Sequence, residues 1–200
     1  MRRLNNVLLF PLFLTLVLVG YLLPWVLTSA SSLSMGAYDL AEWSSLHPIV
    51  KQTAPFLWIT LALRIPLAVL AILLVIYLAK TLHLPSIALV CLFVSAIALL
   101  PPLEFFTTFR DDPNYRQQLF LALFTVVIGT IAVFGKPKSL NLILAITLSA
   151  LGVLASAIGL YQAQILIEGF GLPYSIGFGG VITGIAFAVA TLLHITKQSS

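Results

Sequence analysis

The sequence predicts a single all-α domain, a polytopic membrane helix bundle of about six transmembrane helices that extends over residues 1–200. Hydrophobic residues make up 60% of the chain and charged residues only 8%, whereas soluble domains average about 45–50% and about 25%. The apolar stretches are continuous and do not alternate with polar residues as membrane β-strands do. So few charged side chains cannot cover a water-facing surface, and we expect a lipid bilayer to surround the chain.

Six apolar stretches supply the predicted helices. The first follows Arg2 and Arg3 and is about 22 residues long, which exceeds the about 7–15 residues of a signal-peptide core. We therefore expect it to be retained as a helix. Each of the others is near the length that a helix needs to cross about 30 Å of hydrocarbon. The predicted spans are residues 7–28, 55–79, 86–103, 119–134, 140–167 and 176–195.

The charges between these stretches predict the orientation. With the N-terminus in the cytoplasm, the inner segments hold six basic residues and no acid, whereas the outer segments hold three basic residues and all six acids. The inner basic residues are Arg2, Arg3, Lys80, Lys136, Lys138 and Lys197. The acids are Asp39, Glu42, Glu104, Asp111, Asp112 and Glu168. Because basic residues concentrate on the cytoplasmic side of membrane proteins, we expect both termini to be cytoplasmic.

The longest predicted loop joins the first two spans on the outer side, and it contains a helix signal. Ser34 is a suitable N-cap, and Pro48 should end the helix. Tyr38, Ala41 and Leu46 lie close to one face at helical spacing. We expect a short amphipathic helix that lies on the bundle or in the lipid headgroups.

Arg64 is the one charged residue within a predicted span. A central arginine costs at least about 2.5–3.5 kcal/mol to insert, so such residues usually pair or face a polar cavity. One interpretation is an outward-facing polar or anion site formed by Arg64, Glu104 and Gln164, with Glu104 or another acid of the outer loops as the counter-charge. In the alternative, the Arg64 side chain extends to the outer headgroups, or the true span begins after Leu63.

Small side chains form a continuous face on the fifth predicted helix and a shorter one on the sixth. Close backbone approach over small residues is a main source of packing energy in bilayers. We expect these two helices to pack against each other, and docking of a partner subunit or a flat cofactor is the alternative. The residues are Ala145, Ser149, Gly152, Ser156, Gly159 and Ala163 on the fifth helix, and Gly180, Gly184 and Ala188 on the sixth.

The sequence contains no catalytic or metal-binding motif of recognisable spacing. His83 and His194 are weak candidates for haem or pigment ligands near the inner side, and no HExxH spacing occurs. The single cysteine, Cys91, excludes an intramolecular disulfide and cysteine-rich metal sites. Ser149 and Ser156 lack a Gly-x-Ser-x-Gly context, so we expect no catalytic residues and no required cofactor.

These observations favour a non-enzymatic integral membrane protein. The leading hypothesis is an accessory or structural subunit of a larger membrane complex, respiratory or photosynthetic, whose partners are lipid and other membrane subunits. It depends on the scarce intramembrane charge, the short inner loops and the small-residue faces. The alternative is a small transporter or membrane-embedded solute-binding protein with an outward-facing pocket near Arg64. Nucleic acid is not an expected partner, because no water-exposed domain is present to carry a basic cluster.

Overall fold

A computed structural model describes residues 2–28, 34–46, 57–135, 138–169, 171 and 173–196. Within these residues the fold consists mainly of α-helices. The helices are α1 (Arg2–Leu22), α2 (Ala37–Leu46), α4 (Trp58–Ile76), α5 (Pro85–Leu99), α6 (Pro113–Phe134), α7 (Lys138–Gly169) and α8 (Phe178–Thr196). The π-helical turn η1 (Tyr77–Thr81) continues α4, and the 3-10 turn η2 (Leu103–Phe106) lies between α5 and α6.

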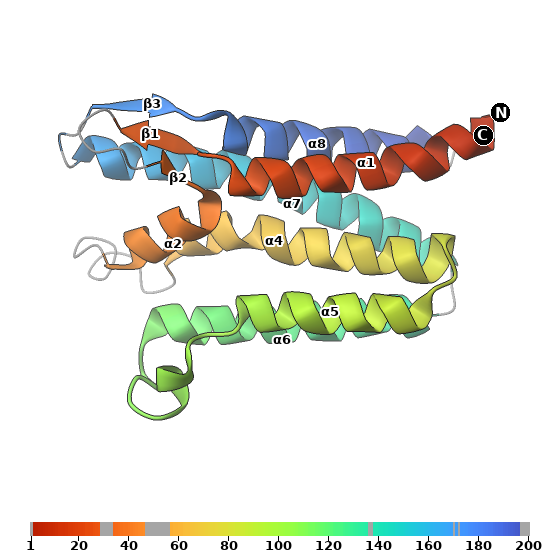
Figure 1. The fold of residues 1–200 in the computed structure, drawn as a ribbon, viewed down its shortest axis with the longest axis horizontal. Coiled ribbons are helices and arrows are strands. Elements are labelled where there is room, and N and C mark those ends of the chain that lie inside the picture. Colours follow the sequence, from red (N-terminus) through yellow and green to blue (C-terminus); the bar gives the residue numbers. More distant parts are fainter. Residues whose placement is uncertain are drawn as a thin grey trace.

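The long helices form a bundle with α4 at its centre. The described part of α4 contacts α1, α2, α5, α6 and α7, while α8 packs between α1 and α7. Figure 1 shows that α1 begins and α8 ends at one end of this bundle, and that α2 lies near the other end. We call the latter the α2 end.

Among the described residues, three helices are long and apolar enough to cross a membrane by length and composition. They are Trp58–Thr81, Pro113–Phe134 and Leu142–Gly169, with mean hydropathies of 2.7, 2.0 and 2.3. Three shorter apolar helices accompany them, over Leu9–Leu22, Pro85–Leu99 and Phe178–Leu193. The structure thus confirms a helical fold that is consistent with a membrane protein.

A small antiparallel sheet at the α2 end departs from the all-α prediction. Its strands are β1 (Val26–Thr28), β2 (Ser34–Met35) and β3 (Tyr174–Ile176), in the order β2-β1-β3. β1 lies within the predicted first span, which was therefore drawn too long, since α1 ends at Leu22 just before Pro24. Strands of two or three residues are too short to produce the alternation of polar and apolar residues by which strands are recognised in a sequence.

The helix of the fourth predicted span begins before that span. α6 begins at Pro113 and not at residue 119, so the polar segment 113–118 is helical. Asp112 is its N-cap, because one carboxylate oxygen accepts hydrogen bonds from the backbone N–H groups of Asn114 and Tyr115 at 2.8 and 3.2 Å. Proline at the first helical position costs nothing there, because that N–H has no partner within the helix. This start extends α6 beyond its apolar part by almost two turns.

The short helix of the first outer loop exists as α2, but its start and its buried face differ from the prediction. Ser34 lies in β2, and α2 begins at Ala37. Tyr38 and Leu46 are exposed, whereas the buried residues are small or central ones: Ala37, Leu40, Ala41, Ser44 and Ser45. Ala37, Leu40 and Ala41 form one cluster with residues of α1, α4 and α7, so this side of α2, without Tyr38 and Leu46, packs against the bundle.

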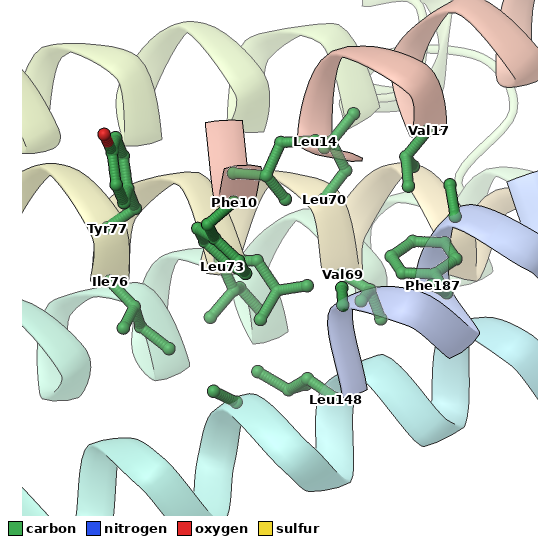
Figure 2. Packing of buried hydrophobic residues seen from close by; sticks show 14 of the residues in the cluster. Phe10, Leu14, Val17, Val69, Leu70, Leu73, Ile76, Tyr77, Leu148 and Phe187 are labelled. Atoms are coloured by element: carbon green, nitrogen blue, oxygen red, sulfur yellow. The ribbon is translucent and has the colours of Figure 1, made fainter. Parts of the chain in front are cut away.

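A cluster of large apolar side chains holds the middle of the bundle together. Figure 2 shows Phe10, Leu14 and Val17 of α1 close to side chains of α4, with Leu148 of α7 and Phe187 of α8 completing the cluster. In a bilayer such a cluster stabilises through van der Waals packing, because lipid tails are as apolar as the side chains themselves. It joins α1, α4, α7 and α8, and it also includes Ala132 of α6.

The small-residue face of α7 lies inside this bundle. All six of its predicted residues are buried. A Cβ added at Gly152 would lie 2.7 Å from the ring of Phe187 in α8, and one added at Gly159 would lie 3.1 Å from Leu63 in α4. The face therefore packs against α4 as well as α8, and only the contact with α8 was expected. On α8, Gly180 is buried, and Gly184 and Ala188 are partly buried.

Candidate functional site

Arg64 lies in α4 with its side chain only 1% exposed, and it joins three helices. Its Nη2 donates to Glu42 Oε1 of α2 at 2.6 Å, which forms an ion pair. Its Nη1 donates to Asn114 Oδ1 of α6 at 2.6 Å and to Gln117 Oε1 at 3.3 Å. The side chain is therefore not extended toward lipid headgroups, and the positive charge has a direct counter-charge.

Further polar side chains extend the hydrogen bonding around this pair. Gln118 Nε2 donates to Glu42 Oε1 at 2.6 Å. Thr60 Oγ1 donates to Gln117 Oε1 at 2.8 Å, and Gln117 Nε2 donates to the Leu57 carbonyl at 3.1 Å. Among the described residues, Arg64 Nε has no hydrogen-bond partner. We call Glu42, Thr60, Arg64, Asn114, Gln117 and Gln118 the Arg64 network.

The capped start of α6 explains how the network forms. Asn114, Gln117 and Gln118 are three and four residues apart, so they lie on one face of the helix. The hydrogen bonds of Asp112 to the first turn fix where the helix begins, and thereby which residues face α4. The polar residues that resembled a loop in the sequence are the ones that hold the arginine.

A pocket of about 330 Å³ opens at the surface beside the network. It is lined by Tyr38, Glu42, Leu100, Pro102, Tyr115 and Gln118. The Glu42 side chain is 37% exposed, whereas Arg64 is buried and is not among the lining residues. The pocket therefore presents the carboxylate of the ion pair and not its guanidinium. We call it the Glu42 pocket.

The two tyrosines of the pocket differ in how they are held. Tyr115 of α6 makes edge-to-face contacts with Phe105 and Phe109, both at a ring-centroid distance of 6.4 Å, and these contacts fix its ring. Tyr38 of α2 is exposed on one side. Burial of its other side and the nearby Glu42 carboxylate raise the pKa of Tyr38 above its ordinary value, so its phenol is neutral at physiological pH.

The predicted site of Arg64, Glu104 and Gln164 is not assembled as expected. Glu104 is exposed in η2, and Gln164 is partly buried on α7. Neither hydrogen-bonds to Arg64 among the described residues. The counter-charge is Glu42, which is the second option named from the sequence, another acid of the outer loops. Since Glu42 occupies the guanidinium, the structure gives no support to an anion site there.

The histidine candidates lie away from this pocket. His83 is exposed at the turn after η1, with a positive φ of 57°, and His194 lies in α8 with a side chain outside the described set. No group of three or more His, Cys, Asp or Glu residues suited to a metal ion occurs among the described residues. The Ser156 hydroxyl donates to the Gly152 carbonyl of its own helix at 2.8 Å. That bond is typical of a packed serine and not of an activated nucleophile.

Comparisons with known proteins identify no relative: no family model matches the sequence, and no curated protein or solved structure is significantly similar to it. A function for this chain has to be inferred from the charges and contacts at the α2 end.

Proposed function

We propose that the chain is a six-span membrane protein whose α2 end faces outward and binds a small solute in the Glu42 pocket. Six apolar helices, α1 and α4 to α8, support the six crossings, and an even number agrees with α1 beginning and α8 ending at the same end of the bundle (Figure 1). All six acids lie in segments that this orientation places outside, and six of the ten basic residues lie inside. Both termini are then cytoplasmic.

The observation that carries this proposal is a concave pocket with an ionised group at its wall. Ligand sites are typically clefts of about 300–1,000 Å³ with an apolar lining and a few convergent polar groups. The Glu42 pocket combines Leu100 and Pro102 with a carboxylate, an amide and two phenols. Because the carboxylate is fixed by Arg64 and Gln118, it needs little reorganisation when a solute binds.

The leading hypothesis from the sequence, an accessory or structural subunit of a larger membrane complex, receives less support. It depended in part on small-residue faces that would dock a partner. Gly152 and Gly159 pack against Phe187 and Leu63 within the fold, so this face is not free for another subunit. The Glu42 pocket instead supports the solute-binding alternative, which we propose without catalysis.

Ligand-induced stabilisation tests this function. The protein is reconstituted in lipid nanodiscs, and its thermal unfolding is followed with benzylamine, benzyl alcohol or benzoate, three probes of similar size and different charge. A solute that binds only the folded state raises the unfolding midpoint by mass action. The substitution Leu100→Trp fills the pocket and should abolish the effect. Val94→Trp, on a 62% exposed position of α5, is the matched control and should preserve it.

Two results would contradict the proposal. In the first, none of the three probes raises the midpoint. In the second, Leu100→Trp responds to a probe as fully as Val94→Trp, which means that the probe acts through the lipid or another surface. Stoichiometric co-purification of a second membrane protein, without any probe effect, would return support to the accessory-subunit hypothesis.

A further inference from the structure

We infer that the Glu42 pocket selects a small organic cation, an amine or a quaternary ammonium with an apolar body. The inference rests on the proposed function, because it names the class of solute that the same pocket takes. Three observations support it: Glu42 lines the pocket while Arg64 lies behind it, two aromatic rings border the pocket, and acids lie around it.

The accessible charge in the wall is negative. Arg64 approaches Glu42 from inside the protein, where it is 1% exposed, and the partly exposed Glu42 lines the pocket. Arg64 and Gln118 both donate to Glu42 Oε1, and no described residue donates to Oε2. An anionic solute would meet this carboxylate first and would reach the guanidinium only by displacing Glu42. A cation meets an acceptor with free lone pairs.

The aromatic lining favours the same sign. Tyr38 and Tyr115 both border the pocket together with Glu42. The face of an aromatic ring attracts a cation. A pocket that combines such rings with a carboxylate suits a quaternary ammonium, which donates no hydrogen bonds, and also a protonated amine, whose N–H groups the carboxylate accepts. Because Tyr115 is fixed by Phe105 and Phe109, its ring is ordered before any ligand binds. Leu100 and Pro102 provide an apolar surface for the rest of the molecule.

The wider α2 end is acidic as well. Asp39 lies on α2 one turn before Glu42, and Asp111 and Asp112 lie just before α6, which carries Tyr115. Two basic residues lie in the segment around Asp111. Arg116 forms an ion pair with Asp111, and Arg110 directly precedes Asp111 in the sequence. These four acids stand against three arginines, Arg64, Arg110 and Arg116, so the segments carry one negative charge in excess. An excess of one sign favours the association of oppositely charged solutes. The charge balance around the pocket therefore favours a cation over an anion, by one charge.

Direct titration of the nanodisc-embedded protein with the three matched probes tests the selectivity. We expect benzylamine to bind, and benzyl alcohol and benzoate to bind at least about tenfold more weakly, since they lack the charge or reverse it. Benzylamine affinity should also fall as salt is added, because exposed charges are screened. Glu42→Gln removes the charge directly, but it also leaves Arg64 without its partner and can unfold the protein.

Tyr38 offers a substitution outside the Arg64 network. Tyr38→Leu removes the ring and should weaken benzylamine binding by about 3- to 30-fold, whereas Tyr38→Phe keeps the ring and should retain the affinity. Equal affinities in the two variants would overturn the aromatic recognition of the cation. Binding of benzoate or benzyl alcohol in preference to benzylamine, blocked by Leu100→Trp, would overturn the choice of a cation and leave the proposed function standing. If no probe binds, the proposed function itself fails.

Discussion

The ion pair between Arg64 and Glu42 has one buried member and one partly exposed member, 1% and 37% exposed, at a distance of 2.6 Å. The buried member lies on a long apolar helix, and the exposed member lies on a short helix outside the spans. The pair therefore connects α2 to α4 and at the same time presents a carboxylate to the Glu42 pocket. A single contact thus contributes to the stability of the α2 end and belongs to the solute site that we propose there.

Loss of the Glu42 charge should destabilise the fold. In Glu42→Gln the buried Arg64 keeps its charge and loses its counter-charge. Breaking a buried pair typically costs about 3–5 kcal/mol. Since Glu42 is partly exposed, water compensates in part, and we expect a loss of about 2–3 kcal/mol in the free energy of unfolding. Denaturant unfolding in detergent micelles measures it.

Asp111→Asn is the matched control, because it removes a carboxylate from the exposed pair between Asp111 and Arg116, whose side chains are 94% and 60% exposed. Its effect should stay within about 0.5 kcal/mol. In the double variant Glu42→Gln with Arg64→Met no buried charge remains, so stability should recover in part. If Glu42→Gln and Asp111→Asn lower the free energy of unfolding by the same amount, the buried pair does not hold α2 in place.

The N-cap of α6 should contribute to the Arg64 network through Asn114. Asp112→Ala removes the acceptor of the Asn114 and Tyr115 backbone N–H groups, and it should cost about 0.5–2 kcal/mol. Asp112→Asn keeps an acceptor oxygen and should lose much less. Asp111→Ala, at the neighbouring exposed position, is the control. Equal unfolding midpoints for Asp112→Ala and Asp111→Ala would mean that this cap does not define the start of α6.

The positions of the apolar helices could be predicted from the sequence because hydropathy is a local property. Each of the six described apolar helices overlaps a predicted span. The start of α6 could not be predicted in this way, because its first turns are polar and resemble a loop in composition. Their polarity has a tertiary cause, since Asn114 and Gln117 bond to Arg64, 50 and 53 residues away in sequence.

The candidate site could likewise be predicted from the sequence only in part. Arg64 itself was conspicuous, because an arginine in an apolar stretch requires compensation. Its partner was not identifiable, since all six acids lay on the expected outer side and nothing local distinguishes Glu42 from Glu104. The packing of α2 on α4 makes that choice. The small-residue face of α7 was likewise visible, but its contact with Leu63 of α4 depends on how the bundle closes.

Close packing of α7 against α8 predicts a steric effect at Gly152. A methyl group there would lie 2.7 Å from the ring of Phe187, and a rigid ring in a packed core cannot easily move aside. Gly152→Ala should therefore destabilise the protein by about 1–3 kcal/mol, which thermal unfolding in micelles measures. Gly169→Ala, where nothing lies within 4 Å, should be neutral or slightly stabilising. In the double variant Gly152→Ala with Phe187→Leu, the smaller side chain at position 187 should recover part of the lost stability. No recovery would argue against this contact.

Six crossings with the α2 end outside predict a specific labelling pattern. In a Cys91→Ser background, which removes the single cysteine, cysteines replace three exposed residues, Asp39, Asp111 and His83. The first two lie at the α2 end, and His83 lies in the turn between η1 and α5, which the six-span arrangement places inside. A membrane-impermeant maleimide should label positions 39 and 111 in sealed cells, and should label position 83 only after permeabilisation. Labelling of position 83 in sealed cells would exclude the proposed orientation. If positions 39 and 111 were also protected in sealed cells, the Glu42 pocket would be closed to solutes from outside.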